Sequence, residues 1–110
     1  MTFIDTDRLS AKEPREGWIG RFFHSRNMTF AYYTVVAGAW IHEHSHSNDE
    51  VWNIIDGQLE ITIAGETQVA GPGCAAVIPP DTLHSVKAIT AVRAIVVDHP
   101  RRHSIGGIDL

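Results

Sequence analysis

The sequence predicts an all-β barrel. Apolar and polar residues alternate with a period of two through most of the 110 residues, and Gly, Pro, Asn or Asp interrupts the alternation at short intervals. Almost no segment repeats its apolar residues with the period of a helix. About nine short strands separated by turns are typical of a β-sandwich or barrel.

The strands are placed by this alternation. In residues 58–63, Leu59, Ile61 and Ile63 alternate with polar residues, so one face of the segment is expected to lie against a core. Hairpin turn sequences flank it, with Asp56-Gly57 before it and residues 64–66 after it. The other expected strands are residues 18–24, 28–36, 40–46, 51–56, 67–70, 74–78, 84–90 and 92–98.

The chain is expected to form one domain with an extension at each end. Its 110 residues are enough for a single core. Pro14 and Gly17 lie among mixed polar residues, so residues 1–17 are expected to be a loosely structured leader, which can serve as an edge strand exchanged with a second chain. The barrel is assigned to residues 18–98, and residues 99–110 are expected to be a C-terminal tail outside it.

Charge and composition exclude several partners. The net charge is -4 and the basic residues are scattered, so no nucleic-acid partner is expected. No run reaches the roughly 18 apolar residues of a membrane span, and the first residues lack the pattern of a secretory signal. We therefore expect no membrane partner and a cytoplasmic location. Cys74 is the only cysteine, so a metal site would have to use His and carboxylates.

Three of the seven histidines lie in the segment His42-Glu43-His44-Ser45-His46. Because strand side chains alternate between faces, all three imidazoles are expected to project from one face. A solvated polar face is the alternative. Three imidazoles followed by Glu50 match the spacing of metal ligands better, and imidazole with carboxylate suits Zn, Fe, Mn, Co or Ni.

One segment of the chain resembles the first motif of the cupin superfamily. It runs from Gly38 through His44-Ser45-His46 and Glu50 to Gly57, and every family-defining position is filled.

A second segment resembles the second cupin motif. It runs from Gly73 through Pro79-Pro80-Asp81 to His84. It departs from the family at Asp81, where Gly is usual, and at Ala88, where Asn is frequent. Asp still suits a turn, because it tolerates unusual backbone angles, and the Asn position binds no metal in the family.

The resemblance implies a double-stranded β-helix, a jelly-roll-like barrel, that holds one divalent transition metal (Fe, Mn, Ni, Co or Zn). It implies His44, His46, Glu50 and His84 as the metal ligands. Four ligands on an octahedral metal leave two adjacent positions for water, substrate or dioxygen. Small cupins are typically dimers, so the resemblance also implies a homodimer.

Further residues are expected around the metal. His42 shares strand parity with the ligands, so it is expected beside them or lining the pocket. Trp40 and Trp52 are expected to wall the pocket, with ordinary core packing as the alternative. The segment from Asp98 to Arg102 resembles the end of small cupins that ketonise unsaturated uronates, although here the Asp lies nearer the Pro and Glu50 replaces a Gln.

The functional hypothesis is a metal-dependent isomerase or lyase acting on a small-molecule substrate. The substrate would be a keto, enol or sugar-acid compound that is isomerised or ketonised, with His42 or Asp98 as the catalytic proton carrier. Two alternatives stay open. One is a non-haem metal dioxygenase, since the open positions would also accept oxygen, and the other is a non-catalytic sugar-binding module.

Overall fold

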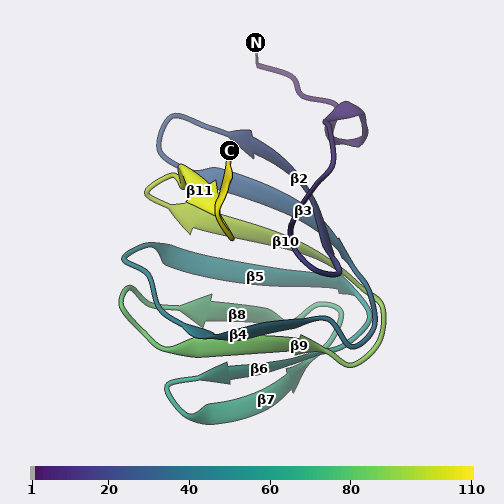
Figure 1. Cartoon of the computed structure of the whole chain (residues 1–110), viewed down its shortest axis with the longest axis vertical. Helices are drawn as coiled ribbons and strands as arrows, with labels where there is room; N and C mark the ends of the chain where they lie inside the picture. Colours follow the sequence, from purple (N-terminus) through teal and green to yellow (C-terminus); the bar gives the residue numbers. More distant parts are fainter. Residues whose placement is uncertain (1) are drawn as a thin grey trace.

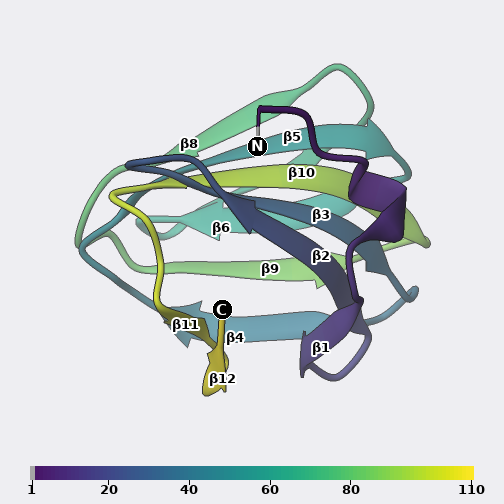
Figure 2. The same cartoon turned by 90° about the horizontal axis from the view of Figure 1, so that it is seen from above.

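Two antiparallel β-sheets face each other in the computed structural model, which describes residues 2–110 (Figure 1). The larger sheet has the strand order β1-β2-β3-β10-β5-β8 and the smaller has the order β4-β9-β6-β7. Figure 2 shows β5, β10, β3 and β2 across the barrel from β9 and β4. The strands are β1 (Lys12–Arg15), β2 (Trp18–His24), β3 (Thr29–Val35), β4 (Trp40–His44), β5 (Asp49–Asp56), β6 (Leu59–Ile63), β7 (Glu66–Ala70), β8 (Ala75–Ile78), β9 (His84–Ala88), β10 (Val92–His99), β11 (Ser104–Ile105) and β12 (Ile108–Asp109).

This architecture confirms the predicted all-β barrel. Every predicted strand is present, with ends that differ from the predicted ends by two residues at most. In β6, Leu59 and Ile61 are buried while Glu60 is exposed, as the alternation requires. The helical part of residues 2–110 is one 3₁₀ turn, η1 (Thr6–Arg8), and none of this region has the length and hydropathy of a membrane-spanning helix.

The leader contributes a strand that its polar sequence conceals. β1 pairs with β2 of the same chain, with Arg15 opposite Trp18. Glu16 and Gly17 form the two-residue connection, and Gly17 has a φ of 84°, which glycine adopts without strain. The larger sheet therefore begins at residue 12, and β1 is its edge strand.

The tail forms a hairpin of its own, β11 and β12, separate from the two main sheets. Its Ile105 is only 5% exposed. Lys12 Nζ donates a hydrogen bond to the Asp109 carbonyl at 3.0 Å, and a Cβ at Gly106 would collide with the Pro14 carbonyl. These contacts hold the leader and the tail against each other beside the barrel (Figure 2).

Candidate metal centre

The inward-facing rows of several strands end in polar residues at one end of the barrel. On β5 the buried row Ile54 and Trp52 continues to Glu50, and on β10 the buried row continues from Val96 to Asp98. β9 begins with His84, which is 1% exposed. Since side chains alternate along a strand, these polar groups face the interior for the same reason as the apolar ones before them.

Two cross-strand pairs bring these groups together. His44 at the end of β4 lies opposite His84 on β9, in the smaller sheet. Glu50 on β5 lies opposite Asp98 on β10, in the larger sheet. His46 lies in the short connection from β4 to β5, between the sheets. The structure thus brings together all four predicted metal ligands, from both sheets.

A bulge in β4 separates His42 from the other histidines. Ile41 lies opposite Val86 and His44 opposite His84, so three steps along β4 match two along β9. Because of this extra residue, His42 and His44 lie on opposite faces of β4 although they are two positions apart. The expectation that all three imidazoles share one face is therefore wrong for His42. Its side chain is exposed and its ring lies 4.2 Å from that of Trp40, between centroids.

Trp40 lies away from the cavity between the ligands and lines the groove beside it instead. Its side chain is 53% exposed, and the cavity between the ligands does not reach it. Trp52, by contrast, is buried and lines that cavity. The two tryptophans that the sequence places on a pocket wall are therefore on opposite faces of the barrel wall, since Trp52 belongs to the buried row of β5 and Trp40 to the exposed row of β4.

Backbone carbonyls set the tautomers of two of the imidazoles. His44 Nδ1 donates to the His42 carbonyl and His84 Nδ1 donates to the Thr82 carbonyl, each at 2.8 Å. A carbonyl can only accept, so Nδ1 carries the proton in both rings. Nε2 is left with its lone pair, which is the form that binds a metal. His42 thus serves the site through its main chain.

The Glu50 carboxylate lies between two imidazoles and an indole. Its oxygens are 3.5 Å from His46 Nε2 and 3.4 Å from His84 Nε2, and Trp52 Nε1 donates to Oε2 at 2.9 Å. Burial favours a raised pKa for Glu50, but the contacts with His46, His84 and Trp52 outweigh it and hold this pKa well below its usual range. Glu50 is therefore an anion at neutral pH.

The two cross-strand imidazoles differ in their proton affinity. Burial lowers the pKa of His44, outweighing the hydrogen bond to the His42 carbonyl. Burial also favours a lower pKa for His84, but the Glu50 carboxylate and the Thr82 carbonyl outweigh it, and the pKa is raised.

Asp98 and Arg102 complete the wall beside Glu50. Arg102 Nη1 lies 3.6 Å from Asp98 Oδ1 and 3.9 Å from Glu50 Oε1. Asp98 is 1% exposed, and its Oδ1 has no hydrogen-bond partner within residues 2–110. Burial first, and then the Glu50 charge, raise the pKa of Asp98 to about 8 against the opposing effect of Arg102. Asp98 therefore holds a proton near neutral pH.

The side chains of His44, His46, His84 and Glu50, called the donor set below, fit a divalent transition metal. One nitrogen from each of His44, His46 and His84 lies within 4.8 Å of the others, and bonds of about 2.1 Å to one ion would bring ligand atoms about 3 to 4 Å apart. Nε2 of His46 and of His84 is buried and hydrogen-bonded to no group in the described part of the chain. Buried polar atoms are costly without a partner, and a cation would supply one.

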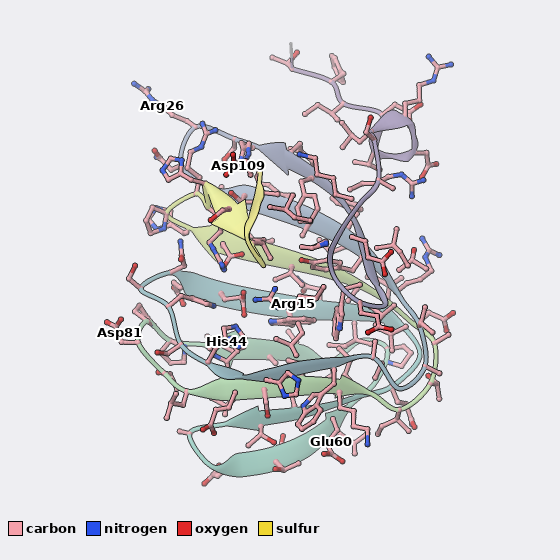
Figure 3. All side chains as sticks on the ribbon, in the orientation of Figure 1. Arg15, Arg26, His44, Glu60, Asp81 and Asp109 are labelled. Atoms are coloured by element: carbon pink, nitrogen blue, oxygen red, sulfur yellow. The ribbon has the colours of Figure 1, made fainter. Side chains whose placement is uncertain are left out.

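Arg15 on β1 is a site residue that the sequence reasoning missed. It lines the same cavity as His44 and Glu50, and Figure 3 shows Arg15 and His44 between β5 and β4. The connection Glu16-Gly17 before Trp18 is the two-residue hairpin signal that could have revealed β1 and thus Arg15.

Comparison with known proteins gives one family. The model of the cupin domain (Cupin_2) matches residues 14–99. The uncharacterised protein SCO3923 of Streptomyces coelicolor is 29% identical over 102 residues, which are 91% of this chain and 97% of that protein.

Solved structures agree with this match. An RmlC-like cupin from Shewanella frigidimarina has a TM-score of 0.87 at 17% identity, over 93% of each chain. KdgF from Halomonas has a TM-score of 0.86 at 24% identity, over 92% of this chain and 96% of that one. These likenesses show the fold. Because the family model covers both sheets and all four predicted ligands, the chain belongs to the cupin family.

Proposed function

We propose that this cupin is a metal-dependent enzyme that moves a proton on a small keto, enol or sugar-acid substrate. The observation that carries the proposal is Asp98, a buried carboxyl group on the wall of the donor set. Its Oδ1 lacks a hydrogen-bond partner within residues 2–110, and it lies within 4.8 Å of the ligand atoms of His46 and Glu50. A proton carrier must reach both the substrate and its activating group, and the proximity of Asp98 to these ligand atoms supports that role.

His44, His46, His84 and Glu50 would hold the metal. When bound, the metal would act as a Lewis acid toward a carbonyl or enolate oxygen of the substrate. Trp52 Nε1 orients Glu50, and the carbonyls of residues 42 and 82 orient His44 and His84. Such partners keep ligand atoms in place while a substrate binds and leaves.

Asp98 would deliver the proton. Its burial raises its pKa and its Oδ1 has no hydrogen-bond partner within residues 2–110, so the carboxyl group is suited to give a proton to a substrate carbon. In a ketonisation the enol oxygen loses its proton and the carbon gains one, so the net change is an isomerisation without an oxidant. Arg102, 3.6 Å from Asp98 Oδ1, would stabilise the carboxylate that remains.

Two similarities support this choice of reaction class. The segment from Asp98 to Arg102 resembles the end of cupins that ketonise unsaturated uronates, and KdgF is among the similar structures. In this chain, the guanidinium of Arg102 lies within 4 Å of the carboxyl groups of Glu50 and Asp98. The residues that carry the resemblance are therefore next to the donor set.

The test is turnover of a panel of unsaturated uronates, β-diketones and 2-oxo acids by metal-loaded protein, with and without air. We expect loss of ultraviolet absorbance without oxygen uptake, abolished when the metal is removed. Asp98→Asn should lower kcat at least about a hundredfold while metal content stays at the wild-type level. The matched control is Asp56→Asn, which changes an exposed carboxylate at the end of β5.

Other outcomes of this test would contradict the proposal. Substrate loss only in air would identify the dioxygenase alternative. Saturable binding without chemical change in metal-loaded protein would identify the non-catalytic sugar-binding module.

A further inference from the structure

Arg15 is a half-buried cation without a counter-charge in the fold. Its guanidinium forms no ion pair or side-chain hydrogen bond within residues 2–110, whereas Arg102 on the same cavity has Asp98 and Glu50. Taking a cation partly out of water is costly unless an anion repays it. The position of Arg15 is therefore suited to a negative group that comes from outside the chain.

The cavity at the donor set is too small for a substrate. Its volume is about 20 Å³, enough for roughly one water molecule. A groove of about 730 Å³ lies next to it between β1 and β4, lined by residues 15–17 and 36–44. Small-molecule sites usually measure about 300 to 1,000 Å³, so this β1–β4 groove has the required size.

Arg15, Ile41 and His44 line both the cavity and the β1–β4 groove. A ligand in the groove would therefore reach the donor set past His44 with Arg15 at its side (Figure 3). Ile105 of the tail hairpin also lines the cavity and is buried, so the tail covers part of its wall, whereas the β1–β4 groove adjoins the cavity at Arg15, Ile41 and His44.

The charges of the cavity wall also favour an anion. Two guanidinium groups, Arg15 and Arg102, face two carboxyl groups, Glu50 and Asp98. A divalent ion on the donor set would add two positive charges to this balance. A small carboxylate that binds beside the ion would reduce the excess positive charge of the cavity. Guanidinium is the side-chain group that best matches carboxylate geometry.

We propose that Arg15 anchors the carboxylate of the substrate, which enters through the β1–β4 groove. The ligand class is thus a small 2-oxo or enol acid that presents its oxygens to the donor set and its carboxylate to Arg15. This inference rests on the proposed metal site, and it makes Arg15 a positioning residue that acts on binding.

The test compares two probes on protein loaded with one equivalent of Co(II), namely pyruvate and its neutral analogue pyruvamide. Binding is followed by the visible absorption of the cobalt and by calorimetry, so it needs no turnover. Wild-type protein should prefer pyruvate. Arg15→Gln should weaken pyruvate binding by about tenfold or more and change pyruvamide binding less than about twofold, because only the charged hydrogen bonds are lost.

Two further variants separate anchoring from a structural role. Arg15→Lys keeps the charge and should recover part of the pyruvate affinity. Arg26→Gln removes the same charge in the loop from β2 to β3, far from the cavity, and should have no effect (Figure 3). Equal loss of both probes in Arg15→Gln, or a wild-type protein that binds pyruvamide as tightly as pyruvate, would overturn the inference.

The same measurements distinguish the inference from the proposed function. Cobalt-loaded protein that shows Arg15-dependent selectivity but turns over no member of the panel would leave the anchor in place and refute the enzyme. Protein that takes up no metal would refute both.

Discussion

Glu50 and Asp98 lie directly opposite each other on β5 and β10, and both face into the barrel. Their environments shift the two carboxyl groups in opposite directions, since the pKa of Glu50 is lowered and that of Asp98 is raised to about 8. One member of the pair is thus suited to be an anionic ligand and the other to carry a proton. Such division of tasks between neighbouring carboxyl groups is a recurring feature of acid–base sites.

The donor set predicts about one divalent metal per chain. His46→Ala and His84→Ala should each abolish tight binding, because each removes an imidazole whose Nε2 lies beside Glu50. His42→Ala is the matched control on β4 and should keep the metal, since its imidazole is outside the site. Elemental analysis of untagged protein measures this. Less than about a tenth of an equivalent in the wild type, or an empty site in His42→Ala, would contradict the assignment.

Trp52→Phe should weaken metal affinity by about tenfold to a hundredfold, because the Nε1 hydrogen bond that orients Glu50 is lost. Trp18→Phe is the matched control. Trp18 is also buried, but its Nε1 has no hydrogen-bond partner within residues 2–110. Competition with a chromophoric chelator measures both affinities. Equal losses in the two variants would mean that ring packing, and not the hydrogen bond, matters.

Metal occupancy should fall as the pH falls. Imidazole ligands must be neutral to bind, and the raised pKa of His84 makes protons compete at and above the ordinary pKa of about 6.5. Glu50, with its lowered pKa, stays ionised throughout this range and does not limit binding. A titration followed by equilibrium dialysis checks this, and full occupancy at about pH 4 would show that the imidazoles are not the ligands.

Asp98 should make the metal-free protein less stable as the pH rises. Its folded pKa of about 8 exceeds the ordinary value of 3.8, so the folded state binds the proton more tightly. The stability that this proton contributes is present below about pH 4 and is lost as the pH rises toward 8. Between pH 5 and pH 8 the unfolding free energy of wild type should therefore fall by about 4 kcal/mol relative to that of Asp98→Asn. Urea unfolding across this range tests it, and a parallel pH dependence in both proteins would contradict it.

We predict a homodimer. Within residues 2–110, β7 and β8 are edge strands of the two sheets, and Val69 on β7 and Val77 on β8 are 58% and 59% exposed. Unpaired edges and exposed apolar side chains favour association with a second copy. Light scattering at micromolar concentration should return about twice the chain mass of 12.2 kDa. A mass of one chain would contradict the prediction.

The sequence carries most of the information about the barrel. Alternation locates the strands because each one buries a single face, and a row such as Val92, Ala94 and Val96 has no other stable arrangement. The proximity of His44, His46, Glu50 and His84 also follows from the two motifs, since their spacing resembles that of a family with one barrel topology.

Two features depend on information that alternation does not contain. The bulge in β4 is a matter of register with β9, so simple parity places His42 on the wrong face. β1 is a short edge strand of polar residues with no apolar row, so Arg15 could be found only through the turn that follows it. In both cases the position of the side chain depends on how its strand pairs with a neighbouring strand, which the alternation within one strand does not reveal.

The main-chain acceptors of His44 and His84 also bear on how the centre tolerates mutation. Every amino acid has a backbone carbonyl, so no substitution at position 42 or 82 can delete the atom that fixes the ring. Side chains at these two positions are free to drift during evolution, or to be replaced by a spectroscopic label, at little risk to the geometry. A deletion of one residue from the bulge is a different matter, because it would change the path of the chain and turn His44 away from His84.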